Sequence, residues 1–293
     1  RGVLNDGTNV VVKIIKSDFE AAFKRDVQRM KRWIRMGLFF RPKLRKVGNP
    51  IGLLAHIEDY TLRELNLLNE IDGRKQLMEN AVSIEDHFAM PKLKFPKMWE
   101  DISNQRVLVM EEITHPTLEK HLEARTLTWP DMLELFRIHG AFMFGLGTFH
   151  GDLHPGNAMM DDKGNFFFID TGAICNAPEH VRNALFGFFY FLAKGELQHA
   201  FDAMLTMAAV RPTGKTLQTY YDSMNELYDG FVGTSVSEVS LTEQMMKTVK
   251  AAVLAGCAFG EEAFPIIRSL MYMDGMVLKG HPHVDLISSM GPY

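Results

Sequence analysis

The chain has 293 residues, of which 46% are apolar and 23% charged, and this globular balance excludes a disordered or low-complexity protein. Its formal net charge of -4 argues against a protein that binds nucleic acid through its overall charge, so we expect no nucleic-acid partner. No uninterrupted apolar run reaches about 18 residues, which excludes a membrane-spanning helix from the sequence at hand.

The first part of the sequence predicts a small lobe of strands with inserted helices. Asn5-Asp6-Gly7 has the composition of a tight turn before a β-branched run, so residues 1–15 are predicted to form a β-hairpin. A helix is expected to begin with Asp18 as its N-cap, because apolar residues then recur at helical spacing: Phe19, Phe23, Val27, Met30 and Ile34. A second helix from Ile51 to Leu68 and two short strands, 89–95 and 106–111, complete this lobe.

The remainder of the sequence predicts a larger helical lobe. After Pro130 the pattern is mainly helical, with one interruption from His150 to Thr171, where a loop leads to a strand at 166–169. The apolar segment 184–193 is too short to span a membrane, so a buried helix is expected there. These elements predict an α+β fold with a lobe at 1–113 and another at 114–293, and ligands commonly bind between such lobes.

Two features bear on where the protein works. Cys175 and Cys257 lie far apart without a Cys-x-x-Cys spacing, so we expect reduced thiols rather than a disulfide or a metal pair. The first residue is Arg1 rather than methionine, so we expect that the chain is cut or processed at its start and that any targeting segment lies upstream.

The residues with the clearest chemistry lie between 149 and 172. The sequence there runs Phe-His-Gly-Asp-Leu-His-Pro-Gly-Asn at 149–157, and Ile-Asp-Thr-Gly follows at 169–172. In phosphoryl transfer from ATP, an aspartate such as Asp152 orients the attacking hydroxyl, while an asparagine and a second aspartate, here Asn157 and Asp170, hold Mg²⁺. This ordered set predicts a kinase-type catalytic loop with Asp152 and Asn157 as catalytic residues and Asn157 and Asp170 as metal ligands.

A lysine early in the chain fits the same chemistry. Lys13 ends the run Val-Val-Val-Lys and can neutralise the α- and β-phosphates of a nucleotide, for which it needs a carboxylate to hold it. Glu64 is the favoured partner, with Glu58 and Asp59 on the same predicted helix as alternatives. Read by itself, Lys13 is also compatible with a solvent-facing strand residue.

Simpler interpretations exist for the loop residues. Asp152 is compatible with a residue that caps the following turn, and Asn157 with a turn asparagine after Gly156. His150 is interpreted as a structural residue that bonds the backbone rather than as a base, and the role of His154 is left open.

Residues 24–46 are strongly basic. Ten lysines or arginines stand there against the single acid Asp26, and together with the apolar stripe of the predicted helix they describe a basic amphipathic helix over 18–36. Such a helix can lie on an anionic membrane surface. The alternative is a helix docked on the core with a solvated basic face.

With these residues in place, the sequence resembles the UbiB (AarF, ABC1-type) family of atypical protein-kinase-like proteins over nearly its whole length. The matching segments are 10–13, the helix Asp59-Tyr60-x-x-x-Glu64-x-Asn66, the inter-lobe segment 106–113, and the loop with Asp152, Asn157 and Asp170. The resemblance implies a bilobal kinase-like fold that binds ATP and Mg²⁺, with Glu64 beside Lys13 and with Glu111 and Ile113 at the nucleotide. It also implies ATPase or kinase activity that supports coenzyme Q or other isoprenoid-lipid metabolism at a membrane.

Departures from the family pattern keep other functions open. Gly151-Asp-Leu replaces the family's Ala-Asp-Pro and is shared with aminoglycoside and choline phosphotransferases, and Asp170-Thr-Gly replaces Asp-Phe-Gly. The alternatives are therefore a small-molecule phosphotransferase, or a nucleotide-binding scaffold in a membrane-associated assembly with lipid or quinone-biosynthesis partners. The resemblance implies a membrane-associated location, mitochondrial, plastid or on the bacterial cytoplasmic face. The family's nucleotide loop and regulatory helix are expected upstream of Arg1.

Overall fold

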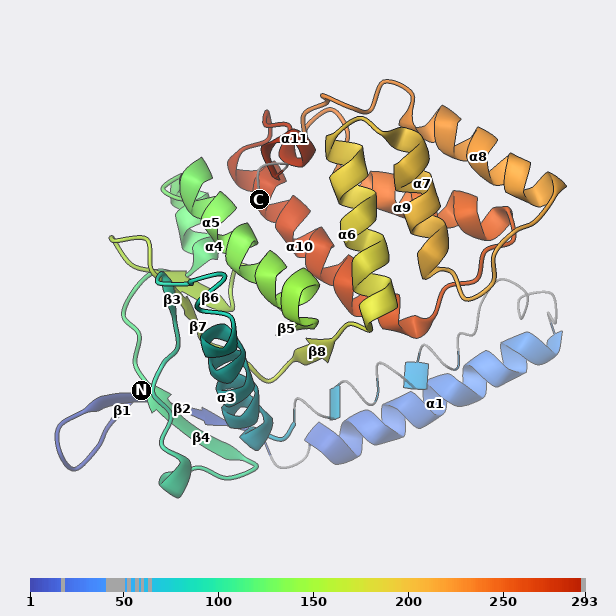
Figure 1. Ribbon diagram of the computed structural model, residues 1–293. Helices are drawn as coiled ribbons and strands as arrows, with labels where there is room; N and C mark the ends of the chain where they lie inside the picture. The colour runs from blue at the N-terminus through green and yellow to red at the C-terminus, as the bar shows by residue number, and fades with distance from the viewer. Residues whose placement is uncertain are drawn as a thin grey trace. The chain divides into compact units, whose positions relative to one another are not determined.

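The computed structural model describes residues 1–16, 19–40, 51, 54–55, 58, 61–62 and 65–290 (Figure 1). These residues fall into two compact units, each of which is described by itself. The first comprises 1–76, 95–114 and 170–173, and the second 77–94, 115–169 and 174–293. The lobe boundary expected between residues 113 and 114 stays a prediction.

The first unit is built on a three-stranded antiparallel sheet in the order β1-β2-β4. Strands β1 (Gly2–Val3) and β2 (Asn9–Ile14) form the predicted hairpin, whose turn needs the positive φ of 88° that Gly7 adopts. Strand β4 (Val107–Glu111) pairs with the whole of β2, so that Lys13 lies opposite Leu108. The short 3-10 helix η2 (Glu100–Ile102) precedes β4.

Two long helices begin in the first unit. Helix α1 (Phe19–Phe40) confirms the expected helix and continues beyond residue 36, whereas its predicted cap Asp18 lies outside the described residues. Helix α3 (Leu68–Ser83) was not predicted, because residues 72–76, which include Gly73, interrupt the helical spacing of its apolar residues. Of the helix expected from Ile51 to Leu68, residues 51, 54–55, 58 and 61–62 are helical, residues 65–67 are not, and Leu68 is the first residue of α3. The other residues of this segment lie outside the described part of the chain.

The second unit contains two small sheets. Strands β3 (Leu93–Lys94), β7 (Phe166–Phe168) and β6 (Ala158–Met160) form one sheet in that order, and β5 (Thr148–His150) pairs with β8 (Ile174–Asn176) in the other. The strand expected at 89–95 is therefore shorter than predicted. Strand β5 directly precedes the loop 151–157 and β6 directly follows it, and each is held by its partner, β8 or β7.

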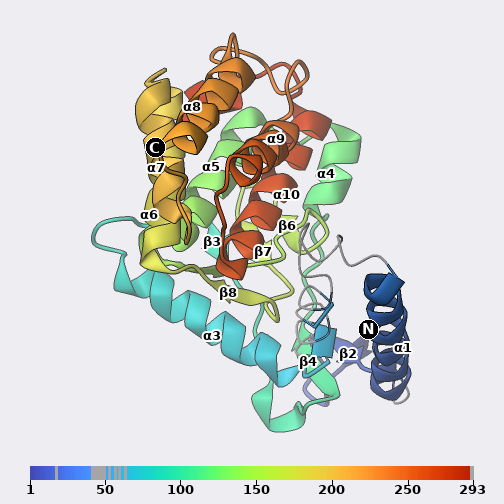
Figure 2. The ribbon, with the colours of Figure 1, turned by 90° about the vertical axis from the view of Figure 1, so that its right-hand side faces the viewer.

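The rest of the second unit is helical, as predicted (Figure 2). Its α-helices, apart from the last residues of α3, are α4 (Leu118–Ala124), α5 (Trp129–Gly140), α6 (Glu179–Ala193), α7 (Leu197–Met207), α8 (Lys215–Tyr228), α9 (Leu241–Leu254), α10 (Phe264–Gly280) and α11 (Leu286–Met290). A π-helical turn, η3 (Ala141–Leu146), continues α5, and a short 3-10 helix, η4 (Glu261–Ala263), precedes α10. Helices α6 and α7 pack side by side, and fully buried aromatic rings such as Phe136, Phe188 and Tyr228 form the core.

The apolar segment 184–193 lies within α6. The helix buries Ala184, Leu185, Phe188 and Leu192, which agrees with the expected core helix, yet Phe186 and Tyr190 on its other side are exposed. In the described part of the chain, no helix has both the length and the apolarity that crossing a membrane requires. Cys175 and Cys257 are both free thiols.

Candidate functional site

Lys13 is held by two carboxylates in the first unit. Its ammonium Nζ lies 2.5 Å from Oε1 of Glu70 on α3 and 2.8 Å from Oδ2 of Asp170. Only 4% of the Glu70 side chain is exposed, against 40% for Lys13 and 35% for Asp170. The lysine therefore has a buried anchor on one side and a more accessible carboxylate on the other.

The local sequence explains why these three groups meet. Lys13 projects from the same side of β2 as Val11, because side chains alternate along a strand. After Asp170, Thr171 is fully buried and its hydroxyl donates a hydrogen bond of 2.6 Å to the backbone oxygen of Glu70. At Gly172 a Cβ would approach Cγ of Glu70 to 3.1 Å. The Thr-Gly pair that replaces Phe-Gly thus fastens the Asp170 segment to the start of α3.

The electrostatics of Lys13 follow from this geometry. Burial lowers the pKa of the Lys13 ammonium, but the negative charges of Asp170 and Glu70 outweigh burial and raise the pKa above its ordinary value of 10.5. Because the folded-state pKa is raised, the two ion pairs stabilise the fold at pH values below the ordinary pKa. Their contribution is lost only as the pH rises through the raised value. Lys13 is therefore a cation at neutral pH.

The loop 151–157 of the second unit is closed by its own hydrogen bonds. Asn157 donates from Nδ2 to the backbone oxygen of Asp152 at 3.0 Å and lies 3.5 Å from Oδ2 of the same residue. The backbone N–H of Asp152 donates to Nδ1 of the buried His150 at 3.2 Å. Asp152 and Asn157, the predicted catalytic pair, are thus brought together, and His150 makes a bond to the backbone as expected.

His154 shapes the turn between the two predicted catalytic residues. Its Nδ1 accepts the backbone N–H of Gly156 at 3.0 Å, and a Cβ on Gly156 would come within 2.8 Å of the His154 ring. A residue with a side chain at position 156 would displace that ring. The structure therefore gives His154 a turn-forming contact, which the sequence left open.

Two residues of the site were missed in the sequence. Tyr272 on α10 donates its hydroxyl proton to Oδ1 of Asp152 at 2.8 Å, and its ring also packs against His154. Glu70 is the carboxylate that reaches Lys13. The long sequence separation of Tyr272 from the loop left no local signal, and Glu70 sits in the helix that was not predicted.

The remaining predicted site residues either lie outside the described residues or make other contacts. Glu64 and Asp59 lie outside the described residues, so a contact of Glu64 with Lys13 stays a prediction. Glu58, the other alternative, forms an ion pair with Lys31 on α1. Glu111 ends β4, where its side chain accepts the backbone N–H of Lys97 at 3.0 Å, and Ile113 follows as a half-buried residue. Their role at a nucleotide also stays a prediction.

The donor groups fit a metal that is shared with a ligand rather than one held by protein alone. Within the described ranges, no three His, Cys, Asp or Glu side chains gather into a metal site. Mg²⁺ is commonly bound by one or two protein oxygens together with phosphates and water. The amide oxygen of Asn157 in the second unit and the carboxylate of Asp170 in the first are each ligands of this kind. That they bind one Mg²⁺ together stays a prediction.

Comparison with known proteins identifies the family. Residues 1–204, more than half of the chain, match the model of the ABC1 atypical kinase-like domain. The chain belongs to the ABC1 atypical kinase-like family. Proteins named "Probable protein kinase UbiB" are similar to nearly all of it: that of Glaesserella parasuis is 21% identical and that of Pasteurella multocida 21% identical, each over 98% of this chain.

A solved structure supports the same fold. The structure of Rv3197 from Mycobacterium tuberculosis, described as a complex with erythromycin, matches 98% of this chain with a TM-score of 0.58 at 18% identity. The predicted α+β kinase-like fold is thereby confirmed. The chain spans about half the length of the curated UbiB relatives, 52% and 54% for the two named above, and 71% of the Rv3197 chain.

Proposed function

We propose that this ABC1-family chain binds ATP with Mg²⁺ and transfers or hydrolyses its terminal phosphoryl group. The observation that carries the proposal is the ammonium of Lys13 between Glu70 and Asp170. A fixed, charged lysine beside a metal-binding aspartate is the arrangement that kinases use to neutralise nucleotide phosphates.

Each residue has a role in this proposal. Lys13 binds the α- and β-phosphates, and Glu70 keeps its ammonium in place from a nearly buried position. When a nucleotide binds, its phosphates replace Asp170 as a partner of Lys13, which leaves the Asp170 carboxylate available to the metal. Asn157 and Asp170 would hold Mg²⁺, which supplies charge neutralisation across the β- and γ-phosphates.

Asp152 is proposed to orient the hydroxyl of the acceptor or a water molecule. Its Oδ1 accepts a hydrogen bond from Tyr272, and its Oδ2 faces the amide of Asn157. These contacts fix the carboxylate while its charge stays available, because a general base must be positioned before it can accept a proton. Tyr272 is accordingly a positioning residue.

The biological context that we propose is coenzyme Q or related isoprenoid-lipid metabolism at a membrane. It is supported by the family and by the UbiB name of the similar proteins. Helix α1 offers the surface for membrane contact, since Met30, Trp33 and Met36 are exposed at intervals of three residues. Arg25, Arg29 and Arg32 are exposed on the same helix. Exposed tryptophan with flanking arginines is typical of helices that lie on anionic membranes.

The proposal is tested by ATP turnover of the full-length protein with Mg²⁺, with and without vesicles that contain an anionic phospholipid. We expect phosphate release by the wild type, loss of nearly all release in Asp170→Asn, and unchanged release in the surface control Asp222→Asn, whose carboxylate is exposed on α8. A wild type that neither binds nor hydrolyses ATP in either condition would refute the proposal. ATP binding with no turnover would support the scaffold alternative, and rapid phosphorylation of soluble amino alcohols the phosphotransferase alternative.

A further inference from the structure

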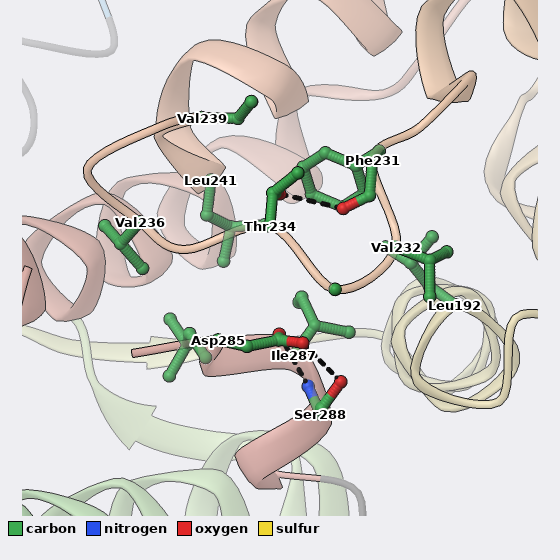
Figure 3. A pocket seen from close by; sticks show the side chains of 12 residues that line it. Leu192, Phe231, Val232, Thr234, Val236, Val239, Leu241, Asp285, Ile287 and Ser288 are labelled. Carbon is green, nitrogen blue, oxygen red and sulfur yellow. Dashed lines mark hydrogen bonds between the residues drawn. The ribbon is translucent and has the colours of Figure 1, made fainter. Parts of the chain in front are cut away.

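The second unit contains an apolar cavity that phosphoryl transfer does not use. Its volume is about 420 Å³, within the range of roughly 300–1,000 Å³ typical of small-molecule sites. Helices α5, α6, α10 and α11, the turn η3 and the segment that follows α3 all contribute to its wall. The hollow beside α11 in Figure 3 is different, because its volume of about 20 Å³ accommodates little more than a water molecule.

Small residues at the π-helical turn create the space. Gly140, Ala141 and Gly145 line the cavity where α5 passes into η3. A Cβ at Gly140 would meet no atom closer than Cδ2 of Phe144, at 4.0 Å, and a Cβ at Gly145 none within 4 Å. π-helical turns are rare and occur frequently at functional sites. The small residues of this turn thus leave a space that larger side chains would fill.

The wall of the cavity is almost entirely apolar. Aromatic rings line it, among them Phe88, Phe136, Phe144, Phe186 and Phe189, and no acidic side chain does. The basic side chains of the wall are His87, which is exposed, and Arg137. The guanidinium of Arg137 already contacts Glu134 at 2.7 and 2.8 Å, the backbone oxygen of Ala89, and the face of Phe88. The part of a ligand that contacts this wall is therefore expected to be hydrocarbon rather than charged.

Two of the aromatic rings that line the cavity, both on α6, are exposed. Phe186 is 50% and Tyr190 42% exposed, and the two rings stack at 6.2 Å with an angle of 19° between their planes. The ammonium of Lys194 lies 4.2 Å from the centre of the Tyr190 ring. Amphipathic rings beside a lysine are typical of a boundary between hydrocarbon and polar head groups.

We infer that this cavity binds the hydrocarbon tail of a lipid, an acyl or isoprenoid chain, whose head group stays at the Tyr190–Lys194 edge. The volume of about 420 Å³ and the aromatic wall suit a single hydrocarbon chain. The inference does not depend on ATP binding, since no residue of the wall belongs to the proposed nucleotide site.

The test is equilibrium binding of cis-parinaric acid, a fluorescent polyene fatty acid, to the full-length protein without nucleotide. We expect saturable binding by the wild type and a loss of about tenfold or more in affinity for Gly140→Leu and Ala193→Phe, which fill the cavity from two walls. The controls are Gly275→Leu on α10 and Ala124→Phe at the end of α4, both exposed and outside the wall. Equal melting temperatures show that the variants are folded.

Competition identifies the chain type. Displacement of the probe by farnesol or by palmitic acid supports the inference and assigns an isoprenoid or an acyl chain. The inference is overturned if the full-length wild type does not bind the probe, if the filled variants bind as tightly as their controls, or if only a fragment lacking the rest of the protein binds. The last result would mean that another segment of the protein occupies the cavity.

Discussion

At the scale of single residues, the proposed nucleotide site depends on the contact between Lys13 and Glu70. Glu70 is buried, while Lys13 and Asp170 are partly accessible, so Glu70 acts as the fixed member of the cluster. Glu70→Gln removes its charge with little change of shape. We expect MgATP affinity to fall by about tenfold, because the lysine loses a charge-assisted hydrogen bond that positions it. Isothermal titration calorimetry measures this, with Glu79→Gln, exposed on the same helix, as the matched control. An unchanged affinity would contradict the proposed role of Glu70 in positioning Lys13.

A buried histidine gives a second prediction at this scale. Burial, with a smaller effect from His150, lowers the pKa of His139 to about 3, and its Nε2 bonds Ser269. The folded state keeps His139 neutral, whereas the unfolded chain takes up a proton below about pH 6.5. Its contribution to stability is therefore complete above pH 6.5 and is lost as the pH falls toward 3, by up to ~1.4 kcal/mol per pH unit.

Urea unfolding between pH 6.5 and 4 checks this linkage. The free energy of unfolding should fall less steeply with decreasing pH in His139→Phe than in the wild type, whatever the constant cost of losing the Ser269 contact. The control is His87→Phe, at an exposed position that follows α3. Equal slopes in His139→Phe and the wild type would contradict the buried, neutral state of His139.

At the scale of elements, the N-terminus of α9 depends on a residue of α10. The carboxylate of Asp274 is buried and accepts the backbone N–H groups of Leu241 and Thr242 at 3.1 and 3.0 Å and the hydroxyl of Ser240 at 2.7 Å. A negative charge at a helix N-terminus also interacts favourably with the helix dipole. Asp274→Asn should lower the free energy of unfolding by roughly 2–3 kcal/mol.

Chemical denaturation followed by circular dichroism measures the Asp274 effect. Asp222→Asn, an exposed change on α8, should leave the midpoint nearly unchanged and serves as the control. If both variants unfold at the same denaturant concentration, the contact between α9 and α10 contributes less than its geometry indicates.

Helix α1 gives a prediction about membranes. The sequence predicted an apolar stripe through Val27, Met30 and Ile34, and the structure buries Val27 but exposes Met30 and also Trp33. Trp33→Ala should lower binding to vesicles with anionic phospholipid, because an interfacial tryptophan contributes buried apolar area. Sedimentation with vesicles measures it against Leu254→Ala, an exposed apolar change on α9. Equal binding of both variants would argue against α1 as the contact surface.

The sequence predicted those features whose signal lies within a short segment of the chain, and it missed those that depend on distant segments. The hairpin, the helix at α1 and the β4 strand carry turn residues or periodic apolar residues, and the Asp152–Asn157 pair lies within one loop. In helix α3 the stretch 72–76 has no apolar side chain and includes Gly73, so the apolar periodicity is weak, and Glu70 was overlooked with the helix. The Tyr272–Asp152 contact joins distant parts of the chain, which no local pattern reveals.

At the scale of the whole molecule, the residues with proposed roles fall into two groups. Lys13, Glu70 and Asp170 belong to the first, and Asp152, Asn157 and Tyr272 to the second. We therefore expect variants of the first group to change MgATP affinity and a variant of Asp152 to change turnover. Changes in the first set should weaken MgATP binding, whereas Asp152→Asn should leave binding nearly intact and reduce turnover by roughly a hundredfold or more, as expected for loss of a general base.

The most direct test of the central claim is the affinity of the full-length protein for MgATP after Lys13→Met, with Lys16→Met, exposed just beyond the same strand, as the matched control. If Lys13 neutralises the nucleotide phosphates, the dissociation constant rises at least about tenfold in Lys13→Met and stays at the wild-type value in Lys16→Met. Equal affinity of Lys13→Met and the wild type would contradict the account, because the lysine held by Glu70 and Asp170 would then have no part in binding the nucleotide.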